Sequence, residues 1–279
     1  NPESRILPMP ELPEVETIVR DLARVLPGRR VRRVEVLRPD LIEGEAAAEF
    51  AAGLRGRHVD TVTRRAKNIV IALGDERLVV NLGMTGRLLV AGAGEVDEKH
   101  TGVRFTLDDG RQLVYHDVRR FGKLWHAALA GWNDWEARLG VEPLSADFTP
   151  AWLHEHAARS RSPIKTWLMD QRRVVGVGNI YASEALFRAG LDPTRPANSL
   201  DAADAARLAA AVREVLQEAI DFRGTTLLDY RDARGERGEF STRLRVYDRA
   251  GEPCRICATP LVRIVQGGRS TFYCPRCQR

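Results

Sequence analysis

Two pairs of cysteines near the C-terminal end constrain the fold of this chain most strongly. Cys254 and Cys257 form one pair, Cys274 and Cys277 the other, and the pattern is C-x2-C-x16-C-x2-C with no further cysteine in 279 residues. Thiolates at this spacing suit a tetrahedral zinc ion, with each pair on a tight turn. Two disulfides are the alternative, less favoured in a chain without an export signal. Because all four ligands would be sulfur, we expect one structural Zn2+.

The first half of the chain is typical of one helix followed by strands. From Pro13, apolar residues recur at helical spacing, and Pro27-Gly28 is expected to end the helix. Between residues 30 and 128 the period switches to two, with turns expected at Gly74-Asp75 and Asp109-Gly110. The helical positions are Val15, Ile18, Val19, Leu22 and Leu26. This half is therefore predicted to be a β-rich domain with a leading helix.

The second half is predicted to be helical up to the cysteines. "SPIKTWLMD" offers Ser162 as a cap with proline at the first helical position, and "NIYASEALFRAG" offers Asn179 as a cap and Gly190 as the end. "SLDAADAARLAAAVREVLQEAIDF" predicts the longest amphipathic helix. One face of that helix carries Leu208, Val212, Val215 and Ala219. "VRIVQGGRSTFY", between the cysteine pairs, predicts two strands joined at Gly267-Gly268.

These patterns predict an α+β multidomain protein. We expect residues 1–9 to be an extension that is not native to the mature protein, followed by a β-rich domain over residues 10–140. A linker over residues 141–150 would lead to a helical domain over 151–248 and a zinc finger over 249–279.

The charge of the chain favours a polyanionic partner. Its net charge is +5 and its pI about 9.3, which suits nucleic acid without proving it. Only four of the 43 basic residues are lysines, so Lys67 and Lys165 are candidates for chemistry that arginine cannot perform. No run of 18 apolar residues occurs, so we expect no membrane span and a cytoplasmic protein.

Six motifs occur in a fixed order along the chain: "PELPEVE", "RRAKNIV", "LGMTGRL", "HDVRRFG", "VVGVGNIYASE" and "GGRSTFYCPRC". Together they resemble the bacterial formamidopyrimidine-DNA glycosylases, which repair 8-oxoguanine. The resemblance runs from Pro10 to the last residue. It implies an N-terminal β-sandwich with a leading helix and a helix–two-turn–helix in the helical domain. It also implies a monomer that excises oxidised purines from double-stranded DNA and cleaves the abasic strand by β,δ-elimination.

The resemblance also implies catalytic roles. Pro10 would attack C1′ of the damaged nucleotide with its N-terminal amine, expel the base and form an iminium. Glu11 would handle protons at the sugar or the proline nitrogen, and Glu14 would orient the nucleophile or favour the first helical turn. Lys67 would bind phosphate near the lesion and assist β-elimination. Arg269 would clamp phosphate for the δ-elimination, mainly through its charge.

Further residues match the DNA-binding set of that family. Met84, Arg119 and Phe121 would fill the space of the everted base, although Met84 could instead pack on the core. The helix start at "GVGN" would bind phosphate. Lys165 and Asn179 are the best side-chain candidates there, His100, Arg161 and Tyr181 are weaker ones, and Glu184 would support the loop. The loop from Thr225 to Phe240 is a candidate lid over the everted base.

Three alternatives remain open at this point. If residues 1–9 stay attached, Pro10 has an inert amide nitrogen, and the protein would bind lesions without cutting. An enzyme of endonuclease VIII type, acting on oxidised pyrimidines, would share the fold. A zinc-ribbon protein that binds RNA or the ribosome would explain the cysteines and the charge, but not Pro10 and Glu11.

Overall fold

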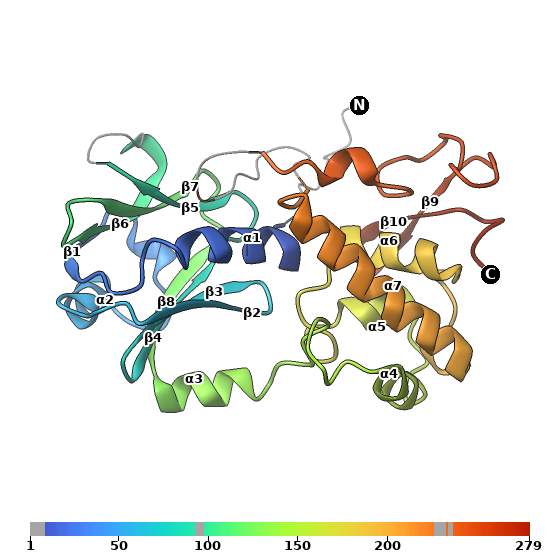
Figure 1. Cartoon of the computed structure of the whole chain (residues 1–279), viewed down its shortest axis with the longest axis horizontal. Helices are drawn as coiled ribbons and strands as arrows, with labels where there is room; N and C mark the ends of the chain where they lie inside the picture. Colours follow the sequence, from blue (N-terminus) through green and yellow to red (C-terminus); the bar gives the residue numbers. More distant parts are fainter. Residues whose placement is uncertain (1–8, 93–97, 226–232, 234–236) are drawn as a thin grey trace. The chain divides into compact units, whose positions relative to one another are not determined.

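The computed structural model describes residues 9–92, 98–225, 233 and 237–279 (Figure 1). The chain divides into two compact units. Unit 1 comprises Asn1–Ala137 together with Phe222–Glu239, and unit 2 comprises Arg138–Asp221 together with Phe240–Arg279. The expected boundaries at residues 140, 150 and 248 stay predictions.

Unit 1 is a sandwich of two antiparallel four-stranded sheets among the described residues, with helix α1 (Leu12–Leu22) at its start. One sheet has the order β1-β6-β7-β5 and the other β2-β3-β4-β8. The strands are β1 (Val31–Val36), β2 (Thr61–Arg65), β3 (Asn68–Leu73), β4 (Glu76–Asn81), β5 (Gly86–Ala91), β6 (Thr101–Leu107), β7 (Gln112–Asp117) and β8 (Lys123–Ala128). The predicted sandwich with a leading helix is confirmed, as are the turns between β3 and β4 and between β6 and β7.

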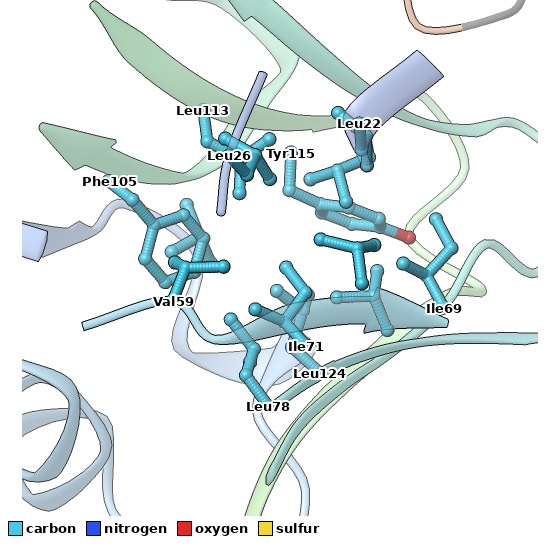
Figure 2. Packing of buried hydrophobic residues seen from close by; sticks show 14 of the residues in the cluster. Leu22, Leu26, Val59, Ile69, Ile71, Leu78, Phe105, Leu113, Tyr115 and Leu124 are labelled. Atoms are coloured by element: carbon cyan, nitrogen blue, oxygen red, sulfur yellow. The ribbon is translucent and has the colours of Figure 1, made fainter. Parts of the chain in front are cut away.

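The core of unit 1 lies between the inner faces of its two sheets (Figure 2). Leu22 and Leu26 enter it from α1 and the turn that follows. Strand residues from both sheets meet them: Ile69, Ile71, Leu78, Phe105, Leu113, Tyr115 and Leu124. Tyr115 is fully buried, and its hydroxyl oxygen points to the end of the cluster opposite Phe105. Each buried leucine stabilises such a core by about 2 kcal/mol.

The elements of unit 1 differ from the prediction in two ways. Helix α1 ends at Leu22 and not at Pro27, because the chain continues in tight turns in which Val25 and Leu26 both bond back to the Leu22 carbonyl. Those turns keep Leu26 in the core, so the apolar spacing outlasts the helix. Two short helices, α2 (Ala47–Leu54) and α3 (Leu129–Glu136), were not predicted within or beside the strand region.

Unit 2 contains the helices α4 (Pro150–Ala157), α5 (Ile164–Met169), α6 (Asn179–Ala189) and α7 (Ala202–Asp221) and the hairpin of β9 (Val262–Gln266) and β10 (Arg269–Tyr273). The predicted face of α7 is buried, as expected for the longest helix. The hairpin turns at Gly267 and Gly268, and Gly190 ends α6 in the left-handed conformation with φ of 70°. No helix in the described part of the chain is long and apolar enough to cross a membrane.

The predicted caps of α5 and α6 were wrong by one residue each. Pro163, not Ser162, is the cap of α5, and the Ser162 hydroxyl pairs with that of Ser160 at 2.8 Å. Gly178, not Asn179, caps α6, because the Asn179 side-chain oxygen accepts a hydrogen bond from Lys165 instead.

Candidate active site and nucleic-acid-binding residues

The start of α1 places two carboxyl groups next to Pro10. Pro10 is buried immediately before the helix, and Glu11 (3 % exposed) occupies the cap position. The backbone N–H of Glu11 donates to Oε2 of Glu14 at 2.9 Å. The turn that presents Pro10 is therefore held by the carboxylate three residues further along the helix.

The second oxygen of the Glu14 carboxylate holds a distant part of the chain. Its Oε1 accepts the backbone N–H of Thr225 at 2.7 Å, and Glu14 is 2 % exposed. Gly224 makes this approach possible, since it has a φ of 83° and a Cβ there would lie 2.9 Å from Oε1. The candidate lid begins at this point, but residues 226–232 and 234–236 lie outside the described residues.

Lys67 lies in the turn between β2 and β3 and is half-buried. Ala66 before it has a positive φ of 55°, and its carbonyl accepts from Nη1 of Arg64 at 2.8 Å. Nε of Arg64 also pairs with Glu16 of α1 at 3.1 Å. This pair fastens the Lys67 hairpin to the helix that begins after Pro10 and Glu11.

Two loops at one end of the sandwich carry the predicted intercalating residues. The first insertion loop, residues 82–85, joins β4 to β5 and contains Met84, which is half-buried. The second insertion loop, residues 118–122, joins β7 to β8 and contains Arg119 and Phe121. Phe121 is 53 % exposed, and Arg119 Cζ lies 4.6 Å from the centroid of its ring. An exposed aromatic ring stacked with a guanidinium is suited to contact nucleobases.

The three weaker DNA-contact candidates lie in different surroundings. His100 is half-buried just before β6, with its ring edge-on to His116 at 5.5 Å between centroids. Arg161 is exposed between α4 and α5. The ring of Tyr181 in α6 is buried and packs against Phe240. Of the three, Arg161 is the one whose charge the structure leaves at the surface.

Lys165 is buried rather than exposed, with 1 % of its surface accessible. Its Nζ donates to Oδ1 of Asn179 at 2.5 Å, to Oγ1 of Thr271 at 2.8 Å and to the Ser270 carbonyl at 3.2 Å. An ammonium has three donors, and these acceptors come from α6 and β10. Lys165 therefore joins the start of α6 to the hairpin that carries Arg269.

Glu184 forms a second buried joint in unit 2. Its carboxylate accepts the backbone N–H groups of Arg245, Val246 and Tyr247 at 2.9–3.0 Å. Burial raises the pKa of Glu184, and these three amides oppose the rise. The sequence predicted a supporting role for Glu184, and the segment that it holds is the one leading into the zinc finger.

The four cysteines converge as the spacing predicted. All their Sγ atoms lie within 4.8 Å of one another, at 3.9 Å for Cys254 to Cys277 and 3.5 Å for Cys257 to Cys274. A tetrahedral ion at about 2.3 Å from each sulfur would separate neighbouring sulfurs by about 3.8 Å. The N–H groups of Ile256 and Cys277 point at sulfur, as suits thiolates. The cysteines are free, so the disulfide alternative is wrong, and the set fits one structural zinc ion.

Arg269 lies at the first position of β10, directly after the Gly267-Gly268 turn, and is exposed. No hydrogen bond or ion pair to its side chain is found among the residues that the structure describes. Its guanidinium is therefore presented to solvent by a hairpin that the cysteine cluster closes.

Several residues of these sites were not selected from the sequence. Thr225 donates its backbone N–H to Glu14, and a backbone group leaves no mark on residue type. Asp117 ends β7 as a charged residue after an apolar strand and is 2 % exposed, a signal that the motif "HDVRRFG" contained. Thr85 and Tyr247 are polar residues in segments where other residues were selected or where only secondary structure was predicted.

Sequence models of three domain families match the chain in order. They are the formamidopyrimidine-DNA glycosylase N-terminal domain over residues 9–124, the H2TH domain of the same enzymes over 139–230, and the zinc finger found in FPG and IleRS over 251–279.

Whole-chain relatives agree with these matches. The chain is 46 % identical to the formamidopyrimidine-DNA glycosylase of Symbiobacterium thermophilum, over 97 % of this chain and 89 % of that protein. It is 45 % identical to that of Herpetosiphon aurantiacus, over 97 % and 100 %.

Solved structures show the same fold. A Lactococcus lactis FPG mutant bound to Fapy-dG DNA has a TM-score of 0.90 and 31 % identity over 97 % of this chain and all of that one. The FPG protein of Thermus thermophilus has a TM-score of 0.86 and 43 % identity over 96 % and 98 %. A further Lactococcus lactis structure, bound to DNA with an oxidised pyrimidine, has a TM-score of 0.89, 31 % identity and 97 % and 100 % coverage. The buried glutamates at the start of α1 and the cysteine cluster both lie within the matched domains. The chain belongs to the formamidopyrimidine-DNA glycosylase family.

Proposed function

We propose that this protein is a base-excision DNA glycosylase and abasic-site lyase that removes oxidised purines, such as 8-oxoguanine and formamidopyrimidines, from duplex DNA. The observation that carries the proposal is the start of α1, where Pro10 is followed by two buried glutamates, Glu11 and Glu14, and the backbone N–H of Glu11 donates to the Glu14 carboxylate at 2.9 Å. A nucleophile flanked by carboxyl groups suits covalent catalysis with proton transfer.

The chemistry requires Pro10 as the first residue. Its secondary amine then forms a bond to C1′ as the bond from C1′ to the base breaks, and ring opening gives an iminium. Loss of a C2′ proton expels the 3′ phosphate, and a second elimination expels the 5′ phosphate. Glu11 serves as the proton carrier at the sugar, and Glu14 holds the N-terminal turn. The family match begins at residue 9, next to Pro10.

Phosphate binding is divided between the two units in this proposal. Lys67, on its fastened hairpin, binds phosphate beside the lesion and assists the first elimination. The exposed Arg269 binds phosphate and stabilises charge in the second elimination. Asn179 contacts the backbone from the start of α6, and Lys165 acts through Asn179. Four to six phosphate contacts imply that log K falls by about 0.9 per contact with log salt.

The insertion loops provide the means of everting the base. Phe121 and Met84 enter the stack, and Arg119 hydrogen-bonds the orphaned cytosine. Eversion costs a few kcal/mol, which the inserted side chains offset. Cys254, Cys257, Cys274 and Cys277 hold zinc, which supplies no chemistry and keeps the Arg269 hairpin in shape. We expect a monomer acting at the bacterial nucleoid in the cytoplasm.

Borohydride trapping tests the proposal. A chain beginning at Met9, the 279-residue chain and a Pro10→Gly variant would each be incubated with duplex DNA carrying 8-oxoguanine opposite cytosine. We expect a covalent adduct from the chain beginning at Met9, and the peptide map of that adduct should begin at Pro10. If a chain with a free Pro10 amine binds the lesion but forms no adduct, the proposed mechanism is wrong.

Oxidised pyrimidines are a second candidate substrate class. The structural relative bound to DNA with an oxidised pyrimidine favours this test. A parallel duplex with thymine glycol measures it, and faster release of thymine glycol than of 8-oxoguanine would assign the protein to pyrimidine repair.

A further inference from the structure

Asp117 is a buried carboxylate at the end of β7, directly before the second insertion loop. No ion pair to it is found within the described part of the chain. It accepts instead from neutral donors, and these include groups of both insertion loops. A charge buried without a cation is stable only if hydrogen bonds occupy its oxygens, so its surroundings must be organised around it.

One oxygen of Asp117 joins the two loops. Its Oδ1 accepts from the hydroxyl of Thr85 in the first loop at 2.5 Å and from the backbone N–H of Arg119 in the second at 3.2 Å. The same N–H of Arg119 also points at Oγ1 of Thr85 at 3.1 Å. Thr85, Asp117 and Arg119 thus form a closed triangle of hydrogen bonds directly beside Met84.

The other oxygen of Asp117 holds the far end of the second loop. Its Oδ2 accepts from the backbone N–H of Gly122 at 2.9 Å and faces the hydroxyl of Tyr115 at 3.3 Å. Burial raises the pKa of Tyr115, and the charge of Asp117 adds to the rise, so the phenol stays a donor. One carboxylate therefore fixes both the beginning and the end of the segment that presents Phe121.

The two loops also touch along their backbones. A Cβ on Gly83 would lie 2.4 Å from the Gly122 nitrogen and 2.6 Å from the Phe121 carbonyl carbon, both in the second loop. Glycine at position 83 therefore lets the loops meet without a side chain between them. The hydrogen bonds of Asp117 therefore act across a contact that is already closed.

A chain of side-chain amides continues from the first loop to the Lys67 hairpin. The N–H of Gly83 donates to Oδ1 of Asn81 at 3.0 Å, and Nδ2 of Asn81 donates to Oδ1 of Asn68 at 2.9 Å. Asn68 is the residue after Lys67. The first insertion loop and the Lys67 hairpin are thus linked through the side chains of Asn81 and Asn68.

We propose that Asp117 is a positioning residue that locks the two insertion loops into one rigid wedge, so that Met84, Arg119 and Phe121 enter DNA together. This role rests on the proposed function of the loops. Asp117 touches no substrate and acts through the backbone of Arg119 and Gly122 and the hydroxyl of Thr85. Its loss is expected to impair base eversion and reading of the opposite base more than the elimination chemistry.

The main variant is Asp117→Asn, which keeps the shape but turns an amide donor toward groups that are themselves donors. Its control is Asp134→Asn, an exposed aspartate of α3 with the same change of charge. Both would be assayed on 8-oxoguanine opposite cytosine, on 8-oxoguanine opposite adenine, and on a preformed abasic site. A 2-aminopurine next to the lesion reports unstacking during insertion.

For Asp117→Asn we expect single-turnover excision of 8-oxoguanine to fall about 10- to 100-fold, as for misplacement by about 1 Å. Cleavage of abasic DNA should fall less than about threefold, because no base has to leave the stack. The rate ratio between the cytosine and adenine duplexes should approach one, and the 2-aminopurine signal should be slower. Asp134→Asn should match the wild type.

A second pair of variants guards against a folding defect. Thr85→Val removes the hydroxyl that bridges Asp117 and Arg119, and Thr85→Ser restores it. We expect the valine variant to share the selective loss of excision and the serine variant to recover it, at temperatures below the measured Tm of each.

The outcomes separate the two proposals. Equal losses of excision and abasic cleavage in Asp117→Asn, or no loss of either, overturn the positioning role while the wild-type activity stands. A wild-type protein with a free Pro10 that is inactive on both substrates overturns the proposed function and this inference with it.

Discussion

Glu14 accepts the backbone N–H of Thr225 at 2.7 Å although 211 positions separate them in the chain. Its other oxygen accepts the N–H of Glu11. One buried carboxylate thus fixes both the turn that presents Pro10 and the segment from which the candidate lid departs. The geometry of the proposed nucleophile, Pro10, and the start of the candidate lid are expected to change together.

Glu14→Gln tests this connection. The amide can accept only one of the two N–H donors and directs its own donor at the other, so we expect a loss of about 2 kcal/mol in the free energy of unfolding. Borohydride trapping should slow, because the turn before α1 loosens. Urea unfolding and trapping rates measure the two effects. Glu43→Gln, at an exposed site, is the control, and an unchanged trapping rate in Glu14→Gln would contradict the prediction.

The salt dependence of DNA binding distinguishes Arg269 from Lys165. Arg269→Ala removes an exposed cation and should reduce the slope of log K against log salt by about 0.9. Lys165→Met removes a buried ammonium whose partners are protein oxygens, so affinity should fall with little change in slope. Titration of a labelled duplex with a tetrahydrofuran abasic-site analogue, which the lyase cannot cleave, measures both at several salt concentrations. A slope change of similar size in Lys165→Met would place its ammonium on phosphate.

Removal of zinc should unfold the C-terminal hairpin. Structural zinc contributes about 10–16 kcal/mol to the folding of zinc fingers, and the hairpin between the cysteine pairs has few buried residues. We expect one zinc per chain by elemental analysis, and loss of DNA binding after chelation or in Cys274→Ser. The far-UV signal of the β-sandwich should persist. DNA binding of wild-type strength without metal would contradict the assignment.

The lowered pKa of Asp204 predicts that unit 2 loses stability at acid pH. Burial alone would raise the pKa of Asp204, but the hydrogen bond and charge of Arg195 outweigh burial and hold the pKa below its usual value, with Arg207 adding to this. A carboxyl group with a lowered pKa in the folded protein stabilises the fold at pH values above its pKa in the unfolded chain, about 3.9. This stabilisation is lost as the pH falls through the pKa of the folded state. Asp204→Asn should be less stable than the wild type at pH 7 and converge with it at low pH. Urea midpoints between about pH 2 and 7 measure the difference, and parallel curves would contradict it.

Local patterns predicted most elements because they mark turns and buried faces. The pair Gly74-Asp75 predicts a turn, and the structure has this turn between β3 and β4. The cysteine spacing predicts a cluster of four thiols, and the four cysteines do come together. Helix α2 was missed because it buries only Phe50 and Leu54, too little to produce a helical period within a strand region. The apolar spacing predicted a helix as far as Leu26, but the residues after Leu22 form turns that bury Leu26 equally well.

The sites were less predictable than the fold because their contacts are long-range. Motifs selected Pro10, Lys67 and the cysteines as candidates, but spacing could not show that Lys165 would be buried against β10. Nor could it show that the carboxylate of Asp117 would join two loops from different strands. Such pairings depend on how elements distant in the sequence pack together, which residue type alone does not encode.

The return of Phe222–Glu239 to unit 1 has a consequence for synthesis on the ribosome. Unit 1 is interrupted by the residues of unit 2 that include α7, so the Thr225 N–H becomes available only after that helix has been translated. Until then the emerging N-terminal region carries the Glu14 carboxylate without this partner. The nascent sandwich is therefore expected to stay loose at the end that holds Pro10, and to mature there last.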